Sequence, residues 1–203
     1  MPQVYVVEDD EAVRRSLCLT LDIFGYDVND FGNGEEFLNA LGEPQLEPAA
    51  LLLDVGLPGL DGLAVQHQLN TEGWRPPVVM ISGQAEISMA VRAMRNGAFS
   101  FLEKPALPNE LQQVLEKAIV EDRSRIDAHQ HREQVLLRIQ SLSRREREVL
   151  DHTLQAKNTK QIAMDLYIDV KTVLRHKSNM LKKMEVRNDI ELLTTVNSVN
   201  DAA

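Results

Sequence analysis

Leu51-Leu52-Leu53-Asp54-Val55-Gly56-Leu57-Pro58-Gly59 is the stretch of this 203-residue sequence that decides its fold. Such an apolar run is typical of a β-strand buried on both faces of a parallel sheet. Pro58 and Gly59 favour a turn directly after it. Open α/β sheets place their ligand sites at the carboxyl ends of strands, so Asp54 is a candidate reactive group. The alternative is an aspartate that merely caps a loop.

Strands and helices alternate around this stretch. Short apolar runs predict strands at about 3–8, 26–31, 51–54, 78–81 and 99–102. Apolar residues at helical spacing predict helices at about 10–24, 34–41, 61–70 and 89–97, and one that begins after Pro108. Five strands alternating with helices indicate an α/β domain with a five-stranded, doubly wound parallel sheet of the flavodoxin-like class.

Charge divides the chain into two parts. Residues 1–120 hold 7 Lys and Arg against 18 Asp and Glu, whereas residues 121–203 hold 15 against 13. An acidic N-terminal part followed by a slightly basic C-terminal part favours nucleic-acid binding at the C-terminal end. Nothing at the N-terminus resembles a signal peptide, and Cys18 is the single cysteine. No apolar run approaches the roughly 18 residues needed to cross a bilayer. We therefore expect a cytoplasmic protein without membrane contact.

The C-terminal part is predicted to be helical. Residues 121–140 are charged and contain no Gly or Pro, which favours a helical linker. Capping signals then predict four helices at about 143–155, 159–167, 170–184 and 188–198. The signals are Ser143-x-x-Glu146, Asn158-x-x-Gln161, Asp169 and Asn188-x-x-Glu191. The middle pair has helix-turn-helix proportions. We expect domains at 1–120 and 141–199, and a disordered tail at 200–203.

Polar residues fall at the carboxyl ends of four predicted strands. They are Glu8, Asp9, Asp54, Ser82 and Lys104. A parallel sheet brings these ends to one edge, where the three carboxylates repel one another and Mg²⁺ with its oxygen ligands relieves the repulsion. Beside a metal ion and an ammonium group, Asp54 can attack phosphorus in line and become an aspartyl phosphate. Ser82 and Lys104 can then contact the phosphoryl oxygens.

Residues 3–120 resemble a response-regulator receiver domain. The segments that carry the resemblance are VVEDD at 6–10, LLLDVGLPGLDG at 51–62, VMISG at 79–83, AMRNGA at 93–98 and FLEKP at 101–105. By this resemblance Asp54 is the phospho-acceptor, Asp9 ligates Mg²⁺ directly and Glu8 acts through water. The backbone carbonyl of Gly56 would complete the protein's ligand set.

The same resemblance gives roles to three further residues. Ser82 takes the place of the switch hydroxyl, Phe101 that of the switch aromatic, and Lys104 that of the lysine that pairs with the phosphoryl group. For Phe101 an ordinary core position remains the alternative. Gly56 departs from the commonest pattern because it offers no side chain beside the acceptor. We expect it to leave the phosphoryl group open to water, with Gln84 the nearest side chain able to orient that water.

Residues 141–196 are similar to the LuxR/FixJ-type helix-turn-helix domain. The matching segments are LSRREREVL at 142–150, KQIAMDL at 160–166, KTVLRH at 171–176 and MLKKM at 180–184. The similarity implies phosphate contacts by Lys160, Lys171, Thr172, His176 and Lys182. It implies base contacts by Leu174, Arg175 and Ser178. Ala156, Thr159 and Leu174 depart from the commoner residues, so the operator sequence is not predicted.

Together the two resemblances imply a two-component transcription factor of the FixJ/NarL family, which is not an enzyme. They imply phosphorylation by a sensor histidine kinase, homodimerisation through residues 86–104, and binding to double-stranded promoter DNA, with RNA polymerase as a further partner. One alternative is a phosphatase of the haloacid-dehalogenase type, which needs an acid at the place of Gly56. Another is a regulator with vestigial Asp54 chemistry and constitutive DNA binding. A Gly-rich nucleotide loop is absent from the sequence.

Overall fold

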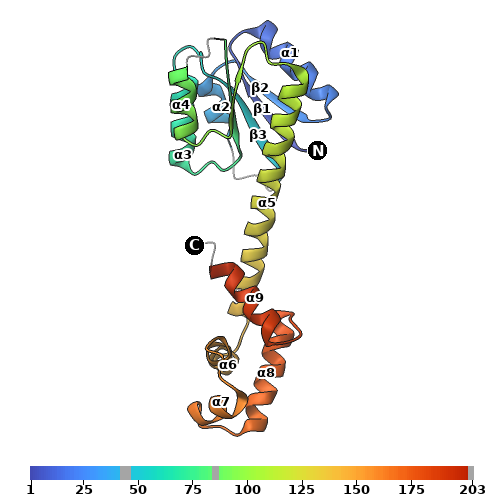
Figure 1. Cartoon of the computed structure of the whole chain (residues 1–203), viewed down its shortest axis with the longest axis vertical. Coiled ribbons are helices and arrows are strands. Elements are labelled where there is room, and N and C mark those ends of the chain that lie inside the picture. The colour runs from blue at the N-terminus through green and yellow to red at the C-terminus, as the bar shows by residue number, and fades with distance from the viewer. Residues whose placement is uncertain (42–46, 84–86, 201–203) are drawn as a thin grey trace. The chain divides into compact units, whose positions relative to one another are not determined.

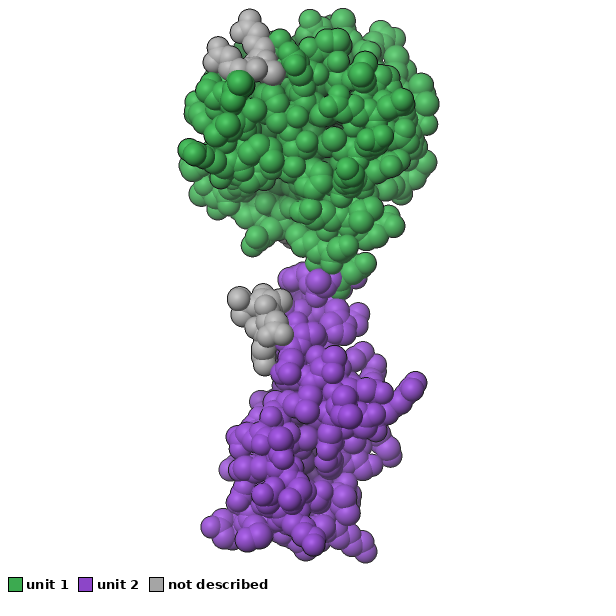
Figure 2. Space-filling view, viewed as in Figure 1, with its two compact units in different colours: residues 1–127 green, residues 128–203 purple. Residues whose placement is uncertain are grey.

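The computed structural model describes residues 1–41, 47–83 and 87–200 (Figure 1). It divides into two compact units, Met1–Asp127 and Ala128–Ala203, which Figure 2 colours separately. Of the expected tail, Asn200 ends a helix, and residues 201–203 lie outside the described residues. Within the described ranges, no helix is long and apolar enough to cross a membrane.

Unit 1 is built on a five-stranded parallel sheet. Its strands are β1 Gln3–Val7, β2 Asp27–Phe31, β3 Ala49–Asp54, β4 Val78–Ser82 and β5 Ser100–Glu103. Their spatial order is β2-β1-β3-β4-β5, which confirms the predicted flavodoxin-like sheet. The ladders pair Val7 with Leu53 and Asp54 with Ile81. The carboxyl ends of the central strands therefore meet at one edge.

Helices bury both faces of this sheet. They are α1 Glu11–Ile23, α2 Gly34–Ala40, α3 Gly62–Glu72, α4 Ile87–Arg95 and α5 Pro108–Gln140. Leu51 and Leu53 pack in a core cluster with α2, α3 and α4, whereas Leu52 packs in a second cluster with α1 and α5. Both faces of β3 are thus buried, as its unbroken apolar run predicts. Gly42, which would end the helix predicted at about 34–41, lies outside the described residues.

A buried carboxylate joins α5 to β3 within unit 1. Asp122 is 1% exposed, and its Oδ2 accepts a hydrogen bond from the Ala49 N–H at 2.9 Å. Its Oδ1 lies 2.6 Å from a guanidinium nitrogen of Arg125. Ala49 is the first residue of β3, so this contact fixes the amino end of the strand that ends in Asp54.

Unit 2 contains the end of α5 and helices α6 Arg144–Leu154, α7 Thr159–Asp165, α8 Val170–Met184 and α9 Asp189–Asn200. The predicted caps are present: Ser143 and Asn158 each form a complete capping box, and Asp169 caps α8. The Asn188 side chain accepts from the Glu191 N–H. One apolar cluster, which includes Val135, Val149, Ile162, Met180 and Leu192, holds these helices together.

Replacing Asp122 with alanine should lower the free energy of unfolding of unit 1 by about 1–3 kcal/mol, because the buried Ala49 N–H loses its acceptor. Urea unfolding followed by the fluorescence of Trp74, the only tryptophan, measures this change in the full chain. Asp127→Ala, at an exposed site of the same helix, is the control and should change stability by less than about 0.5 kcal/mol. Equal unfolding midpoints for both variants would contradict the assigned role.

Candidate functional site

Three carboxylates and one ammonium group meet at the carboxyl edge of the sheet. Glu8 and Asp9 follow β1, Asp54 ends β3, and each offers an oxygen within 4.8 Å of the others. Lys104 follows β5, and its Nζ lies 2.6 Å from Glu8 Oε2 and 3.1 Å from Asp54 Oδ1. The structure thus brings four of the predicted site residues together from three strands.

Burial makes the charge balance of this cluster unfavourable without a cation. Glu8 and Asp54 are 1% and 4% exposed, whereas Asp9 is exposed. Burial raises the pKa of Glu8, and the hydrogen bond from Lys104 offsets part of that rise. Burial by itself would lower the pKa of Lys104, but its bonds to Glu8 and Asp54 raise it overall. One ammonium faces three carboxylates, so the all-oxygen donor set fits a hard divalent cation.

Arg14 of α1 supports the loop that carries Asp9. Its Nη1 donates to the Glu8 carbonyl at 2.7 Å, and its Nε donates to Asp30 Oδ2 at 3.0 Å. Asp10 accepts from backbone N–H groups of the first turn of α1. The loop is therefore fixed from both sides. Sequence reasoning missed Arg14, although a basic residue one helical turn after the N-cap Asp10 is a signal that can be sought.

Two glycines shape the loop after Asp54. A Cβ atom at Gly62 would lie 2.1 Å from the Asp54 carbonyl oxygen, so only glycine lets α3 begin this close to the strand. Among the described residues, a Cβ atom at Gly56 would meet only Asp54 Oδ2, at 3.6 Å, which is an ordinary contact. Space beside the Asp54 carboxylate is thus open to a side chain at position 56. Gln84, expected to orient water here, lies outside the described residues.

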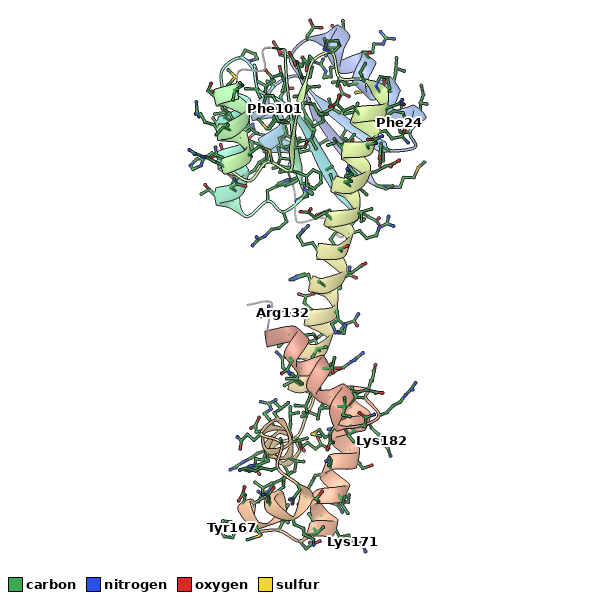
Figure 3. All side chains as sticks on the ribbon, in the orientation of Figure 1. Phe24, Phe101, Arg132, Tyr167, Lys171 and Lys182 are labelled. Atoms are coloured by element: carbon green, nitrogen blue, oxygen red, sulfur yellow. The ribbon has the colours of Figure 1, made fainter. Side chains whose placement is uncertain are left out.

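Ser82 and Phe101 lie on the neighbouring strands. Ser82 ends β4, is 5% exposed, and its carbonyl accepts from the Lys104 N–H at 2.8 Å. Phe101 lies in β5, half-buried, and packs against the core cluster shared by α2, α3 and α4 (Figure 3). Lys104-Pro105 is a cis peptide. Ser82 thus lies at the sheet edge that carries Asp54. The position of Phe101 fits both a switch role and ordinary core packing.

A buried amide connects α3 to the end of α4. Gln66 is 1% exposed, and its Nε2 lies 3.1 Å from the Ala93 carbonyl and 3.3 Å from that of Asn96. Asn70 Nδ2 also donates to the Asn96 carbonyl, at 2.7 Å. These bonds satisfy carbonyl groups at the C-terminal end of α4. The exposed apolar side chains of α4 are Ile87, Val91 and Met94.

The DNA contacts expected on α8 include a row along one exposed face. At about 100° per residue, five of them fall within a sector of roughly 100°. They are Lys171, Leu174, Arg175, Ser178 and Lys182, all exposed. Figure 3 labels Lys171 and Lys182 near the two ends of the helix. The opposite face is buried and consists of Val173, Met180 and Met184. Thr172 and His176 are half-buried, and Lys160 is exposed at the start of α7.

Two other lysines of α8 make contacts inside unit 2. Lys177 lies 2.5 Å from a carboxylate oxygen of Asp189, and Lys183 lies 2.7 Å from Glu146 Oε2. The hydrogen bond from Lys183 lowers the pKa of the buried Glu146. The structure therefore separates the basic residues of α8 into an outward row and a pair that binds other helices, a distinction absent from the sequence pattern.

Comparisons with known proteins agree with these two units. The family described as "Response regulator receiver domain" matches residues 4–116, and "Bacterial regulatory proteins, luxR family" matches residues 140–196. The transcriptional regulatory protein FixJ of Bradyrhizobium diazoefficiens is 32% identical over 94% of this chain and 92% of its own length. The response regulator protein TmoT of Ectopseudomonas mendocina is 35% identical over 98% and 90%.

Solved structures give the same result. The response regulator StyR has a TM-score of 0.87 and 34% identity over 97% of this chain and 98% of its own. Full-length FixJ from B. japonicum has a TM-score of 0.58 and 30% identity over 98% and 97%. A five-stranded receiver sheet with an acidic edge is thus followed by a LuxR-type helical domain. The chain belongs to the LuxR-type family of DNA-binding transcriptional response regulators.

Proposed function

We propose that a sensor histidine kinase switches this transcription factor by transferring a phosphoryl group to Asp54. The carrying observation is the position of the buried Asp54 carboxylate, 3.1 Å from the Lys104 ammonium and beside the oxygens of Glu8 and Asp9. A nucleophilic carboxylate needs a cation to neutralise the charge that gathers on the transferring group. Lys104 supplies one such charge at this edge.

In the transfer step, an oxygen of Asp54 forms a bond to phosphorus while the phosphorus–nitrogen bond of the kinase phosphohistidine breaks. Lys104 holds Oδ1, so Oδ2, on the side of Gly56, is the oxygen that attacks. Mg²⁺ held by Asp9, Asp54 and the Gly56 carbonyl, with Glu8 acting through water, would neutralise charge on the equatorial phosphoryl oxygens. Ser82 then donates to a phosphoryl oxygen, and Lys104 remains paired with the new dianion.

The added charge on Asp54 changes the surface formed by α4 and β5. Ser82 and Phe101 move toward the phosphoryl group, and the exposed apolar side chains of α4 become the homodimer contact. Two DNA-binding domains, each joined to its receiver through residues 121–140, then occupy paired half-sites of promoter DNA. RNA polymerase is the next partner in this scheme. The site of action is the cytoplasm, where the promoter lies, and no membrane contact is involved.

The rival functions fit the site less well. A phosphatase of the haloacid-dehalogenase type needs a second acid two residues after its nucleophile, and Gly56 stands there without a side chain. A constitutive regulator with vestigial chemistry has no need of three carboxylates beside the Lys104 ammonium, because the excess negative charge costs stability unless a further cation binds. Both points support the phosphorylation switch.

Asp54→Asn should abolish phosphorylation by acetyl phosphate with Mg²⁺, since the amide oxygen is a poor nucleophile. Incorporation is measured by electrophoresis that retards the phosphorylated form, dimerisation by light scattering, and promoter affinity by fluorescence anisotropy. Wild type should gain dimer and DNA affinity on treatment, and the variant should gain neither. Lys104→Ala should be phosphorylated more slowly and should not gain dimer, because the transferring group loses one of the charges that neutralise it. Identical responses of wild type and Asp54→Asn would refute the switch.

Gly56→Asn should lengthen the lifetime of phosphorylated Asp54, because the new side chain fills the space beside Oδ2 and shields the phosphoryl group from water. We expect a several-fold slower loss, about 1 kcal/mol in barrier. Gln84→Ala should also slow the loss. Decay is followed in the presence of Mg²⁺ after the phosphodonor has been removed by desalting, which stops further transfer. Unchanged decay rates in both variants would contradict the proposed access of water.

Arg175→Ala should weaken operator binding by roughly 1–3 kcal/mol, and the loss should be confined to particular base pairs, because Arg can pair with a guanine edge. Affinities for a set of singly substituted operators give this pattern. Lys182→Ala serves as the comparison, with a uniform loss and a shallower dependence on salt. A uniform loss for Arg175→Ala as well would reassign it to the phosphate backbone.

A further inference from the structure

Asp169 places a carboxylate at the N-terminus of α8. It is the N-cap residue, and its Oδ1 accepts from the Thr172 N–H at 2.8 Å. Its Oδ2 accepts from the Thr172 hydroxyl at 2.5 Å. These bonds lower the pKa of Asp169, so the group is charged at neutral pH. Asp169 and Lys171 are exposed.

Unlike other acids near α8, Asp169 forms no ion pair with a basic side chain of the described residues. Asp165 is paired with Lys157, Asp189 with Lys177, and Glu185 with Arg138. Among the residues that the structure describes, no Lys, Arg or His nitrogen lies within 4.0 Å of the Asp169 carboxylate, since no such pair with Asp169 is present. The helix dipole offsets part of this charge, so a reduced negative charge faces the solvent in front of the helix.

The N-terminus of a helix normally attracts phosphate, because its free N–H groups and the helix dipole favour an anion. A recognition helix presents this end to DNA. Here the Asp169 carboxylate takes the Thr172 N–H and hydroxyl, two donors that a phosphate oxygen would otherwise use. It also repels the phosphate. The end of α8 that is best placed to bind the DNA backbone is thus partly blocked.

We infer that Asp169 lowers the affinity of this chain for DNA by holding an unpaired negative charge at the N-terminus of α8. The inference rests on the proposed function, in which Arg175 of α8 reads base pairs of promoter DNA. With Asp169 in place, a single domain binds weakly, and stable occupancy depends on two domains acting together. The residue thereby strengthens the dependence of DNA binding on dimerisation.

A control variant needs a charge that lies far from the N-terminus of α8. Glu185 caps the other end of the 15-residue helix. At about 1.5 Å per residue the two ends lie roughly 22 Å apart, whereas charges are screened over about 8 Å at physiological salt. Asp169→Asn and Glu185→Gln change the net charge equally. Only the first removes a charge from the end that faces the DNA.

The test uses the full chain and a fluorescein-labelled duplex of mixed sequence, about 30 base pairs long, in anisotropy titrations between about 50 and 200 mM KCl. Asp169→Asn should bind roughly two- to five-fold more tightly than wild type, the effect of one exposed charge contact, and its affinity should fall more steeply with salt. Asn is itself a good N-cap, so the helix is kept. If thermal melting nevertheless shows that Asp169→Asn is destabilised, Asp169→Ser, also a capping residue, takes its place.

Control variants separate the possible failures. Glu185→Gln should bind as wild type does, and Lys171→Ala should bind more weakly. If Lys171→Ala weakens binding but a folded Asp169 variant binds no tighter, the inference is wrong and the proposed function stands. Equal gains in DNA affinity for Asp169→Asn and Glu185→Gln would also overturn the inference, because they would show that only the net charge of the protein matters. If neither Lys171→Ala nor Arg175→Ala weakens binding, the proposed role of α8 fails and the inference fails with it.

Discussion

The contact of the Lys104 ammonium with Glu8 and Asp54 is the interaction on which the acidic edge of the receiver sheet depends. Two carboxylates that are nearly inaccessible to water are costly unless a cation pairs with them. The lysine comes from the end of β5, while its partners come from β1 and β3, so the pairing requires the strand order β2-β1-β3-β4-β5. Fold and reactivity are therefore coupled at one atom, Nζ of Lys104.

Much of the fold was predictable because its signals are local. The apolar run of β3, the alternation of strands with helices, and the caps Ser143 and Asn158 act within a few residues, and the structure confirms them. The start of β3 was not predictable in the same way. Its first residue, Ala49, has a weak strand preference, and its N–H is satisfied by Asp122, 73 positions away. A local pattern contains no information about such a partner.

The acidic cluster was predictable because each member lies at the end of a strand or within two residues of it, and parallel strands end at one edge. The basic residues of α8 were harder. Lys177 and Lys183 look like Lys171 and Lys182 in the sequence, but Asp189 and Glu146, on other helices, bind the first two. Arg14 was missed for the same reason, since its role depends on the Glu8 carbonyl and on Asp30. The residue type indicates which chemistry a side chain can perform, whereas its tertiary contacts decide which role it takes in the folded protein.

Hydrogen bonds from the Gln66 and Asn70 side-chain amides of α3 to carbonyl groups at the end of α4 couple the two helices. Displacing the C-terminal end of α4 must either carry α3 with it or leave the buried Gln66 amide unpaired, at a cost of about 1–3 kcal/mol. At its other end α3 begins at Gly62, where a Cβ atom would lie 2.1 Å from the Asp54 carbonyl oxygen. The exposed face of α4 and the backbone of Asp54 are thus joined through α3, by a connection that does not include Ser82 or Phe101.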